Sequence, residues 1–215
     1  MNNIVAGFVF VPMKDGQGAY VAIKVMSGLT TKFAKSPTGG FEYHIHERPV
    51  GPNNNCSATG DHLDPTKVGV AIKCNPAKPE SCQEGDLSGK HGDFMATESG
   101  SLPWITYKDY QLRFSGKETT IAGRSIVIHN NVTRVACANI LPLSAFYTYP
   151  GKSADGQVLP EDAQLPPELQ GLMDIPVLEE RAVVATSEQK SGGGRLPTRS
   201  NVAAVVLAAA GVVLV

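Results

Sequence analysis

The sequence predicts an all-β fold, a sandwich or barrel, over roughly the first 150 of its 215 residues. Short runs rich in β-branched and aromatic residues are separated by Gly, Pro, Asn and Asp, which is typical of strands joined by turns. No window in this part sustains the period of an α-helix. The predicted strands cover residues 4–12, 18–29, 41–47, 92–98, 110–116, 123–129 and 134–141.

The two ends of this region define its limits. The first predicted strand, residues 4–12, alternates and stops at Pro12, and it lacks the basic region that opens a signal peptide. After residue 148 the composition shifts to Pro, Glu, Gln, Ser and Gly, which predicts a poorly ordered stalk over residues 149–194. The net charge of −1 favours neither nucleic acid nor an anionic lipid surface as a partner.

Two of the predicted strands carry histidines that could bind a metal ion. Successive side chains of a strand point to opposite faces, so His44 and His46 share one face while Ile45 lies on the other. The strand 123–129 ends in His129, which can join a site at the edge of its sheet. Three or four imidazoles from separate strands suit Cu(II), and they also suit Zn(II). By itself, however, a His-x-His pair on a strand is more often solvated or hydrogen-bonded than a metal ligand.

The cysteines favour an oxidising compartment. The chain has four of them, Cys56, Cys74, Cys82 and Cys137. If all are oxidised, three pairings are possible. A zinc site of four thiolates normally needs pairs separated by two to four residues, and the spacings here are wider, so disulfides are favoured. Glycosylation sequons at Asn55 and Asn131 agree with this interpretation.

The end of the chain resembles the signal for a glycosylphosphatidylinositol anchor. Residues 202–215 are apolar but too few for the roughly 20 residues of a membrane-spanning helix. A polar spacer, GRLPTRSN, precedes them, and the small residues Ser191, Gly192 and Gly193 precede the spacer. We expect an anchor signal over residues 195–215; a short tail-anchor helix or a disordered end is the alternative. We also expect an upstream segment with a signal peptide and a further strand.

Five ordered motifs over about residues 3–142 resemble the copper-zinc superoxide dismutases, and above all their extracellular copper-only relatives in fungi and oomycetes. The motifs are YHIHERPV, NNCSATGDHLDP, EGDLSGKHG, GRSIVIHNN and TRVACANI. This resemblance implies a Greek-key β-barrel over residues 1–148 that lacks its first strand and therefore exposes a pairing edge. It also implies a monomer that acts on the superoxide anion.

The resemblance further implies the residues of the site. Copper would be held by His44, His46, His62 and His129, and Arg134 would lie beside the copper to receive superoxide. Cys56 would pair with Cys137, which leaves Cys74 and Cys82 for a second, local bridge.

The chain departs from the copper-zinc pattern at two places. No histidine lies between His62 and His91, where those enzymes carry two zinc ligands. His62 and Asp86 alone remain of that set, too few for a structural zinc site, so we expect copper and no zinc. Residues 130–133 form a short connection where those enzymes carry a long charged loop, and the copper is therefore expected to be open to solvent.

The residues behind His62 also differ. Without zinc, the outer nitrogen of His62 needs another partner, and Asp86 is the expected one. The copper-only relatives usually carry a glutamate three positions before this aspartate; here that position is Gln83, followed by Glu84. A glutamine can orient an imidazole but cannot deliver a proton, so Glu84 is the candidate donor. We expect His91 to be structural and Lys90 to be a solvated turn residue.

The sequence therefore predicts copper-dependent dismutation of superoxide to O2 and hydrogen peroxide at the cell surface or cell wall. Contact with a membrane is expected only through the anchor. A non-catalytic copper-binding or copper-buffering protein is the main alternative. A structural adhesion module with incidental histidines is a second one.

Overall fold

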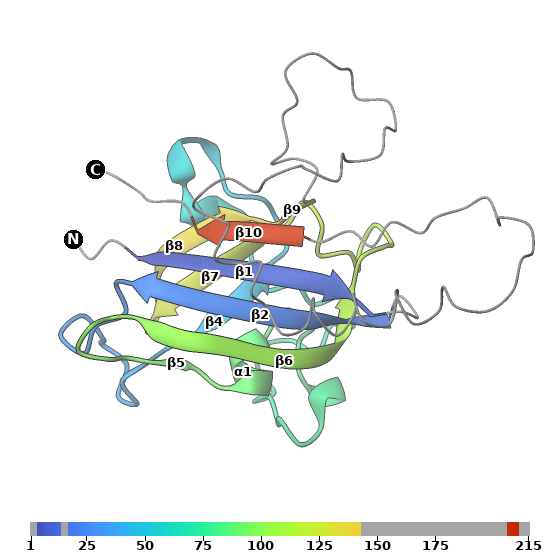
Figure 1. Ribbon diagram of the computed structural model, residues 1–215. Coiled ribbons are helices and arrows are strands. Elements are labelled where there is room, and N and C mark those ends of the chain that lie inside the picture. Colours follow the sequence, from blue (N-terminus) through green and yellow to red (C-terminus); the bar gives the residue numbers. More distant parts are fainter. Residues whose placement is uncertain (1–3, 14–16, 143–205, 211–215) are drawn as a thin grey trace, which may run out of the picture. The chain divides into compact units, whose positions relative to one another are not determined.

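The computed structural model describes residues 4–13, 17–142 and 206–210, and it confirms the all-β fold (Figure 1). The strands are β1 (Val5–Pro12), β2 (Gln17–Ser27), β3 (Gly40–Phe41), β4 (Tyr43–His46), β5 (Phe94–Met95), β6 (Leu102–Arg113), β7 (Ser125–Asn130), β8 (Thr133–Asn139), β9 (Leu141–Pro142) and β10 (Val206–Ala210). They form a five-stranded sheet in the order β6-β2-β1-β10-β9, a three-stranded sheet β4-β7-β8 and a pair β3-β5.

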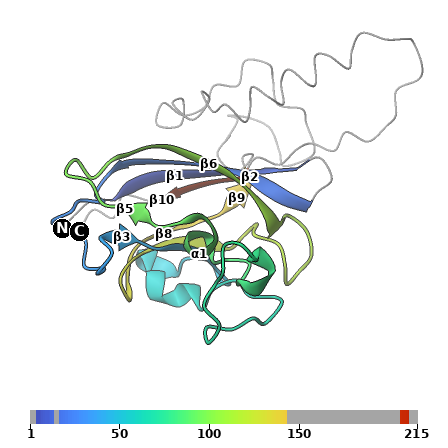
Figure 2. The same ribbon diagram turned by 90° about the horizontal axis from the view of Figure 1, so that it is seen from below.

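The five-stranded sheet packs against the layer that contains β3, β5 and β8 (Figure 2). Aromatic side chains fill the space between them. The Phe8 ring of β1 lies 6.2 Å from the ring of Tyr43 and 6.1 Å from that of Phe94, and Tyr43 and Phe94 stack at 3.9 Å. All three are fully buried or nearly so. Aromatic packing therefore fixes Tyr43, the residue that immediately precedes His44 in β4.

The described residues contain short helical segments that the sequence did not predict. They are the 3-10 turns η1 (Pro52–Asn54), η2 (Cys56–Thr59) and η3 (Pro79–Ser81) and the helix α1 (Leu87–His91). Segments of three to five residues complete less than two turns, so they leave no periodic pattern in the sequence. They belong to the loops that cover the three-stranded sheet.

Strand β6 begins at Leu102, earlier than the predicted start at residue 110. It is the edge strand of its sheet, and it contains Pro103 and a mixture of charged and apolar residues. Proline within a strand is tolerated at such an edge, but it weakens the signal for a strand in the sequence. The first eight of its twelve residues were therefore missed, including Asp109, which is buried.

The edge of β1 that the sequence predicted to be unpaired is paired. Strand β10 lies antiparallel to β1, from Ala6 opposite Ala210 to Phe10 opposite Val206, and β2 lies on the other side of β1. The expected open edge is therefore wrong for this structure. The strand comes from the segment predicted to be an anchor signal, and that prediction is not tested by the pairing. The predicted stalk and the small residues of the anchor site lie outside the described residues.

Within the described ranges, no helix combines the length and hydrophobicity needed to cross a membrane.

Candidate metal centre

Strand β4 presents two histidines on the face opposite the core. Tyr43 and Ile45 belong to the hydrophobic core between the sheets, so His44 and His46 point away from it, as the alternation predicted. Both are nonetheless buried, with 5% and 1% of their surface exposed, because the loops after β4 cover this face. In β7, Ile126 and Ile128 likewise enter the core.

The four predicted ligands converge. One ring nitrogen from each lies within 4.8 Å of those of the others, and the four residues are His44, His46, His62 and His129. Strand pairing causes this, because β4 lies antiparallel to β7, and His62 forms an isolated bridge with His46. In the part of the chain that the structure describes, no other group of three or more histidine, cysteine or acidic residues is placed to hold a metal ion.

Hydrogen bonds decide which nitrogen each histidine presents. His46 Nδ1 lies 2.8 Å from the carbonyl oxygen of Gly60, and His62 Nδ1 lies 2.8 Å from Gln83 Oε1. Each of these nitrogens therefore carries the proton, which leaves Nε2 as a free ligand atom. His46 Nε2 faces His129 Nε2 at 3.2 Å, as two nitrogens directed at one point would.

His44 is oriented in the opposite way. Its Nε2 lies 3.0 Å from Ser88 Oγ and 3.4 Å from Asp86 Oδ1, while its Nδ1 is buried without any hydrogen-bond partner. Buried polar atoms without a partner are rare in folded proteins. An orphaned imidazole nitrogen directed at three other free nitrogens fits a metal ion, and it fits no hydrogen bond within the described part of the protein.

Three of the four histidines are held in their neutral form. Burial, reinforced by the neighbouring imidazoles, lowers the pKa of His129 to about 3 and that of His62 to about 4. Burial likewise lowers the pKa of His46 to about 3, although its hydrogen bond to Gly60 opposes the shift. Neutral imidazole is the form that binds a metal, so the site does not have to release protons at neutral pH.

A ring of three backbone hydrogen bonds ties together the segments that carry the ligands. The Ile45 amide donates to the Gly85 carbonyl (2.9 Å), the Gly85 amide to the Leu63 carbonyl (2.8 Å), and the Leu63 amide to the Ile45 carbonyl (2.8 Å). Ile45 lies between two ligands in sequence and Leu63 follows a third. We call this ring the backbone junction. A Cβ at Gly85 would overlap the Ile45 carbonyl oxygen and crowd Leu63, so the junction requires glycine.

Arg134 is held beside the histidine cluster. Its guanidinium donates to the carbonyl oxygens of Cys56 (3.0 Å) and Ser57 (3.1 Å) and to that of Gly60 (2.6 Å). The Gly60 oxygen is also the partner of His46, so the arginine and a ligand share one acceptor. Arg134 remains partly exposed, so its charge is fixed in position and still open to solvent.

Two disulfides stabilise these loops. Cys56 is joined to Cys137 of β8, with the two Cα atoms 5.6 Å apart, and Cys74 is joined to Cys82. The pairing is the one that the family resemblance implied. The first bridge fixes the loop that binds Arg134.

The chain matches the family model described as copper/zinc superoxide dismutase (SODC) over residues 5–140. It belongs to this family. The match covers more than half of the chain, and its range includes all four histidines of the cluster.

The names of individual relatives agree with this family membership. The chain is 38% identical over 141 residues to the cell surface Cu-only superoxide dismutase 5 of Candida albicans, covering 65% of this chain and 55% of the relative. It is 41% identical over 99 residues to a cell surface Cu-only superoxide dismutase of Arthroderma benhamiae, covering 45% of this chain and 26% of the relative. The chain thus spans about half, or less, of the length of these relatives.

A solved structure matches as well. It is Candida albicans superoxide dismutase 5 in a variant with a glutamate replaced by glutamine. The two structures share 30% sequence identity with a TM-score of 0.50, and the match covers 74% of this chain and 100% of the other.

The partner of His62 in this family member differs from the expected one. Gln83, which is 9% exposed, holds His62 through its Oε1 and donates from its Nε2 to Asp64 Oδ2 at 3.0 Å. Asp86 was expected in this role, but its carboxylate caps α1 by accepting from the Gly89 amide at 2.8 Å, and it faces His44. The cap directs Asp86 towards the helix, so the expected contact with His62 is wrong.

Glu84 lies away from His62. Its side chain is 8% exposed and helps to line a pocket of about 310 Å³ with Gln111, Arg113 and three residues of neighbouring loops. Its Oε2 has no hydrogen-bond partner in the described structure. The geometry therefore gives no support to Glu84 as a proton donor at His62.

Sequence reasoning missed three residues that shape the site. Ser88 contacts His44, Asp64 holds Gln83, and Gly85 closes the backbone junction. Ser88 and Gly85 lie in the EGDLSGKHG motif, beside Asp86, and Asp64 lies two residues after His62. Their proximity to these residues in sequence was a usable signal, but their contacts depend on the folded loops.

Replacing Gly85 with alanine should damage the metal centre. The added Cβ forces apart the Gly85 and Ile45 segments, so in the Gly85→Ala variant we expect the free energy of unfolding to fall by about 1–3 kcal/mol. We expect the dissociation constant for Cu(II) to rise by roughly 10-fold or more. Denaturant unfolding and chelator competition measure the two effects. Gly39→Ala is the control for copper binding: Gly39 has a φ of 72°, so alanine strains the backbone and lowers stability there, but its Cβ meets no atom within 4 Å and lies outside the junction. Equal copper binding in the two variants would contradict the role of the junction.

The metal-free protein should lose stability as the pH falls. Unfolded histidine has a pKa near 6.5, whereas burial lowers the pKa of His46 and His129 to about 3 and that of His62 to about 4. The unfolded chain therefore binds more protons between these values. The stability contribution is complete above about pH 6.5 and is lost progressively down to about pH 3. Urea unfolding across this range measures it. A smaller slope is expected for His129→Gln, and an equal slope would argue against this cause.

Proposed function

We propose that this chain catalyses copper-dependent dismutation of superoxide, in which two superoxide anions and two protons give O2 and hydrogen peroxide. The observation that carries the proposal is the orphaned Nδ1 of His44, buried and directed at three other free imidazole nitrogens. Four nitrogen ligands suit Cu(II), and relatives of the chain are named Cu-only superoxide dismutases. Copper, when bound, supplies one-electron redox chemistry, which zinc lacks.

The residues of the chain hold the metal and direct the substrate. His44, His46, His62 and His129 are the ligands. Hydrogen bonds of the rings to the Gly60 carbonyl oxygen, to Gln83 Oε1 and to Ser88 Oγ fix the ring orientations, which raises the precision of the ligand set. Arg134 supplies a fixed positive charge beside His46, where it attracts the anion; superoxide dismutases are themselves a standard example of such steering.

We propose that the site works without zinc. The outer nitrogen of His62 is engaged by Gln83, and Asp86 is engaged by His44 and by the start of α1. These contacts use the residues that remain of the zinc set in the copper-zinc pattern. A hydrogen bond from His62 to the oxygen of a neutral amide then fixes the ring of His62, as a second cation would otherwise do.

We place this activity outside the cell. The two disulfides and the names of the cell surface relatives support an extracellular location. Asn55 and Asn131 are exposed and are proposed glycosylation sites. We also propose that a glycosylphosphatidylinositol anchor is attached near residues 191–193 and that the protein is a monomer. Both proposals rest on the sequence.

One observation favours a second function, in which the chain binds copper without turnover. Gln83 occupies the position behind His62, and an amide cannot deliver the proton that hydrogen peroxide needs. In a dismutase with this site, the protons come from solvent. In a copper-holding protein they are not needed.

Superoxide decay measured by stopped flow on the copper-loaded full chain distinguishes these functions. We expect rapid decay with one copper per chain, and a loss of 10-fold or more in His129→Ala because one ligand nitrogen is removed. Slow decay despite one bound copper would establish the copper-holding function. Failure to bind copper would exclude both.

Neutralising Arg134 should slow capture of superoxide without emptying the metal site. In Arg134→Met we expect about a 10-fold lower rate, unchanged copper content and a flatter dependence of the rate on ionic strength, since steering by a fixed charge is screened by salt. Arg113→Met is the matched control, because the Arg113 guanidinium donates to the carbonyl oxygens of Tyr110 and Leu112 in its own strand, β6. Equal rates in the two variants would refute the role of Arg134.

A further inference from the structure

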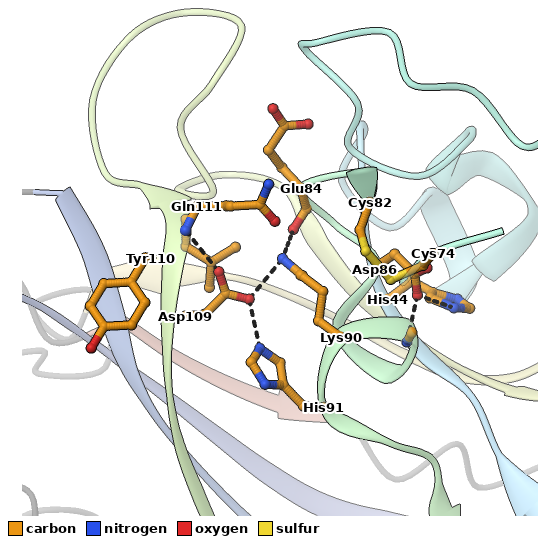
Figure 3. A network of polar contacts seen from close by, with 12 residues as sticks. His44, Cys74, Cys82, Glu84, Asp86, Lys90, His91, Asp109, Tyr110 and Gln111 are labelled. Atoms are coloured by element: carbon orange, nitrogen blue, oxygen red, sulfur yellow. Dashed lines mark hydrogen bonds and ion pairs between the residues drawn. A yellow bond between two sulfur atoms is a disulfide. The ribbon is translucent and has the colours of Figure 1, made fainter. Parts of the chain in front are cut away.

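A buried ion pair lies behind the loops of the metal centre. Lys90 of α1 places its Nζ 2.7 Å from Asp109 Oδ2 of β6, and each side chain is 1% exposed (Figure 3). The prediction that Lys90 is a solvated turn residue is therefore wrong. Removing two charges from water costs free energy that their attraction often fails to recover, so a buried pair is weak evidence of a stabilising role. Its contacts indicate a different one.

Asp109 is fully engaged. Its Oδ2 accepts from Lys90 and lies 3.0 Å from Nε2 of His91, and its Oδ1 accepts from the Gln111 amide at 2.9 Å. The ring of His91 also stacks on Tyr107 of β6 at 3.8 Å. Burial would raise the pKa of the Asp109 carboxyl, but these contacts with His91 and Lys90 hold it at about 2. Asp109 is therefore a charged, immobile anchor at neutral pH, and helix α1 is attached to β6 at two points.

Lys90 also connects Asp109 to the loop of the metal centre that contains Glu84. Its Nζ also donates to the carbonyl oxygen of Glu84 at 2.8 Å (Figure 3). Glu84 immediately precedes Gly85, the member of the backbone junction that requires glycine. A continuous series of contacts thus runs from Asp109 in the five-stranded sheet, through Lys90, to the junction that links the ligand segments.

The loop that Lys90 holds contains the partners of two ligands. Gln83, one residue before Glu84, binds His62, and Asp86, two residues after it, faces His44. A displacement of this short segment would therefore turn both imidazoles.

We propose that the Lys90–Asp109 ion pair is a positioning device for the metal centre. By fixing residues 83–86 against β6, it sets the orientation of His62 and His44 and hence the affinity and electronic environment of the bound copper. The inference rests on the proposed function for the identity of the metal. Neither Lys90 nor Asp109 touches a ligand nitrogen, so both act as positioning residues.

The test compares Lys90→Met, Asp109→Asn and the double variant that carries both changes. Lys90→Met leaves the buried Asp109 carboxylate without its cation, and Asp109→Asn leaves the buried Lys90 ammonium without its anion. Both single variants are therefore expected to be destabilised. The double variant removes both charges and should recover part of the lost melting temperature. It still lacks the contact to Glu84, so we expect its Cu(II) dissociation constant to stay roughly 10-fold above that of the wild type. Its Cu(II) electron paramagnetic resonance spectrum should also be altered.

Lys24→Met provides the matched control. Lys24 of β2 donates from its Nζ to the carbonyl oxygen of Leu102 at 3.0 Å, a similar contact at the same sheet that does not involve the metal loops. We expect this variant to keep the copper affinity and spectrum of the wild type. A double variant that likewise keeps both would overturn the proposal, because the ion pair would then be merely structural.

A readout on the metal-free protein separates this proposal from the proposed function. Amide hydrogen exchange at Ile45, Leu63 and Gly85 reports on the junction directly. Faster exchange at these amides in the double variant, but not in Lys24→Met, supports the positioning role even if the wild type binds copper without turnover or binds none. Unchanged exchange would overturn it whatever the activity.

Discussion

The metal centre depends on the ring of backbone hydrogen bonds that joins Ile45, Leu63 and Gly85. Strand β4 supplies two of the proposed ligands, one on either side of Ile45, and His62 precedes Leu63, but strand geometry alone would not bring His62 to them. The ring does this with main-chain groups, whose positions do not vary with rotamer. It tolerates no side chain at Gly85 because the Ile45 carbonyl occupies the space. The ligand set is thus preorganised by the backbone, and the side-chain hydrogen bonds only choose which nitrogen faces the metal.

Rigid elements hold this ring from two sides. On one side, the aromatic stack of Tyr43 on Phe94 fixes β4 in the core. On the other, the Cys56–Cys137 disulfide holds the loop that binds Arg134 to β8 and closes a sequence separation of 81 residues. In the chain-entropy account, a loop of this length contributes roughly 4–5 kcal/mol. The loops of the site are therefore restrained by the aromatic core on one side and by strand β8 on the other.

The polar partners of the ligands show how an imidazole can be oriented without a second metal ion. Gln83 accepts a hydrogen bond from His62 and donates one to Asp64. Asp86 contacts His44 and caps the start of α1. In the proposed zinc-free site, a neutral amide orients the ring without adding charge or an acidic proton. In the proposed dismutation, Arg134 would attract the superoxide anion and the protons would come from solvent.

The sequence by itself determined the features that depend on local periodicity. The two-residue period of a strand placed His44 and His46 together and Ile45 in the core, and the turn residues defined an all-β chain. The ligand set and the disulfide pairing came from the motifs of the family. Only the tertiary structure decided that Gln83 rather than Asp86 orients His62, that Lys90 is buried, and that β10 covers the edge of β1. Each of these depends on which distant segments pack against one another, and no local pattern of residues encodes that choice.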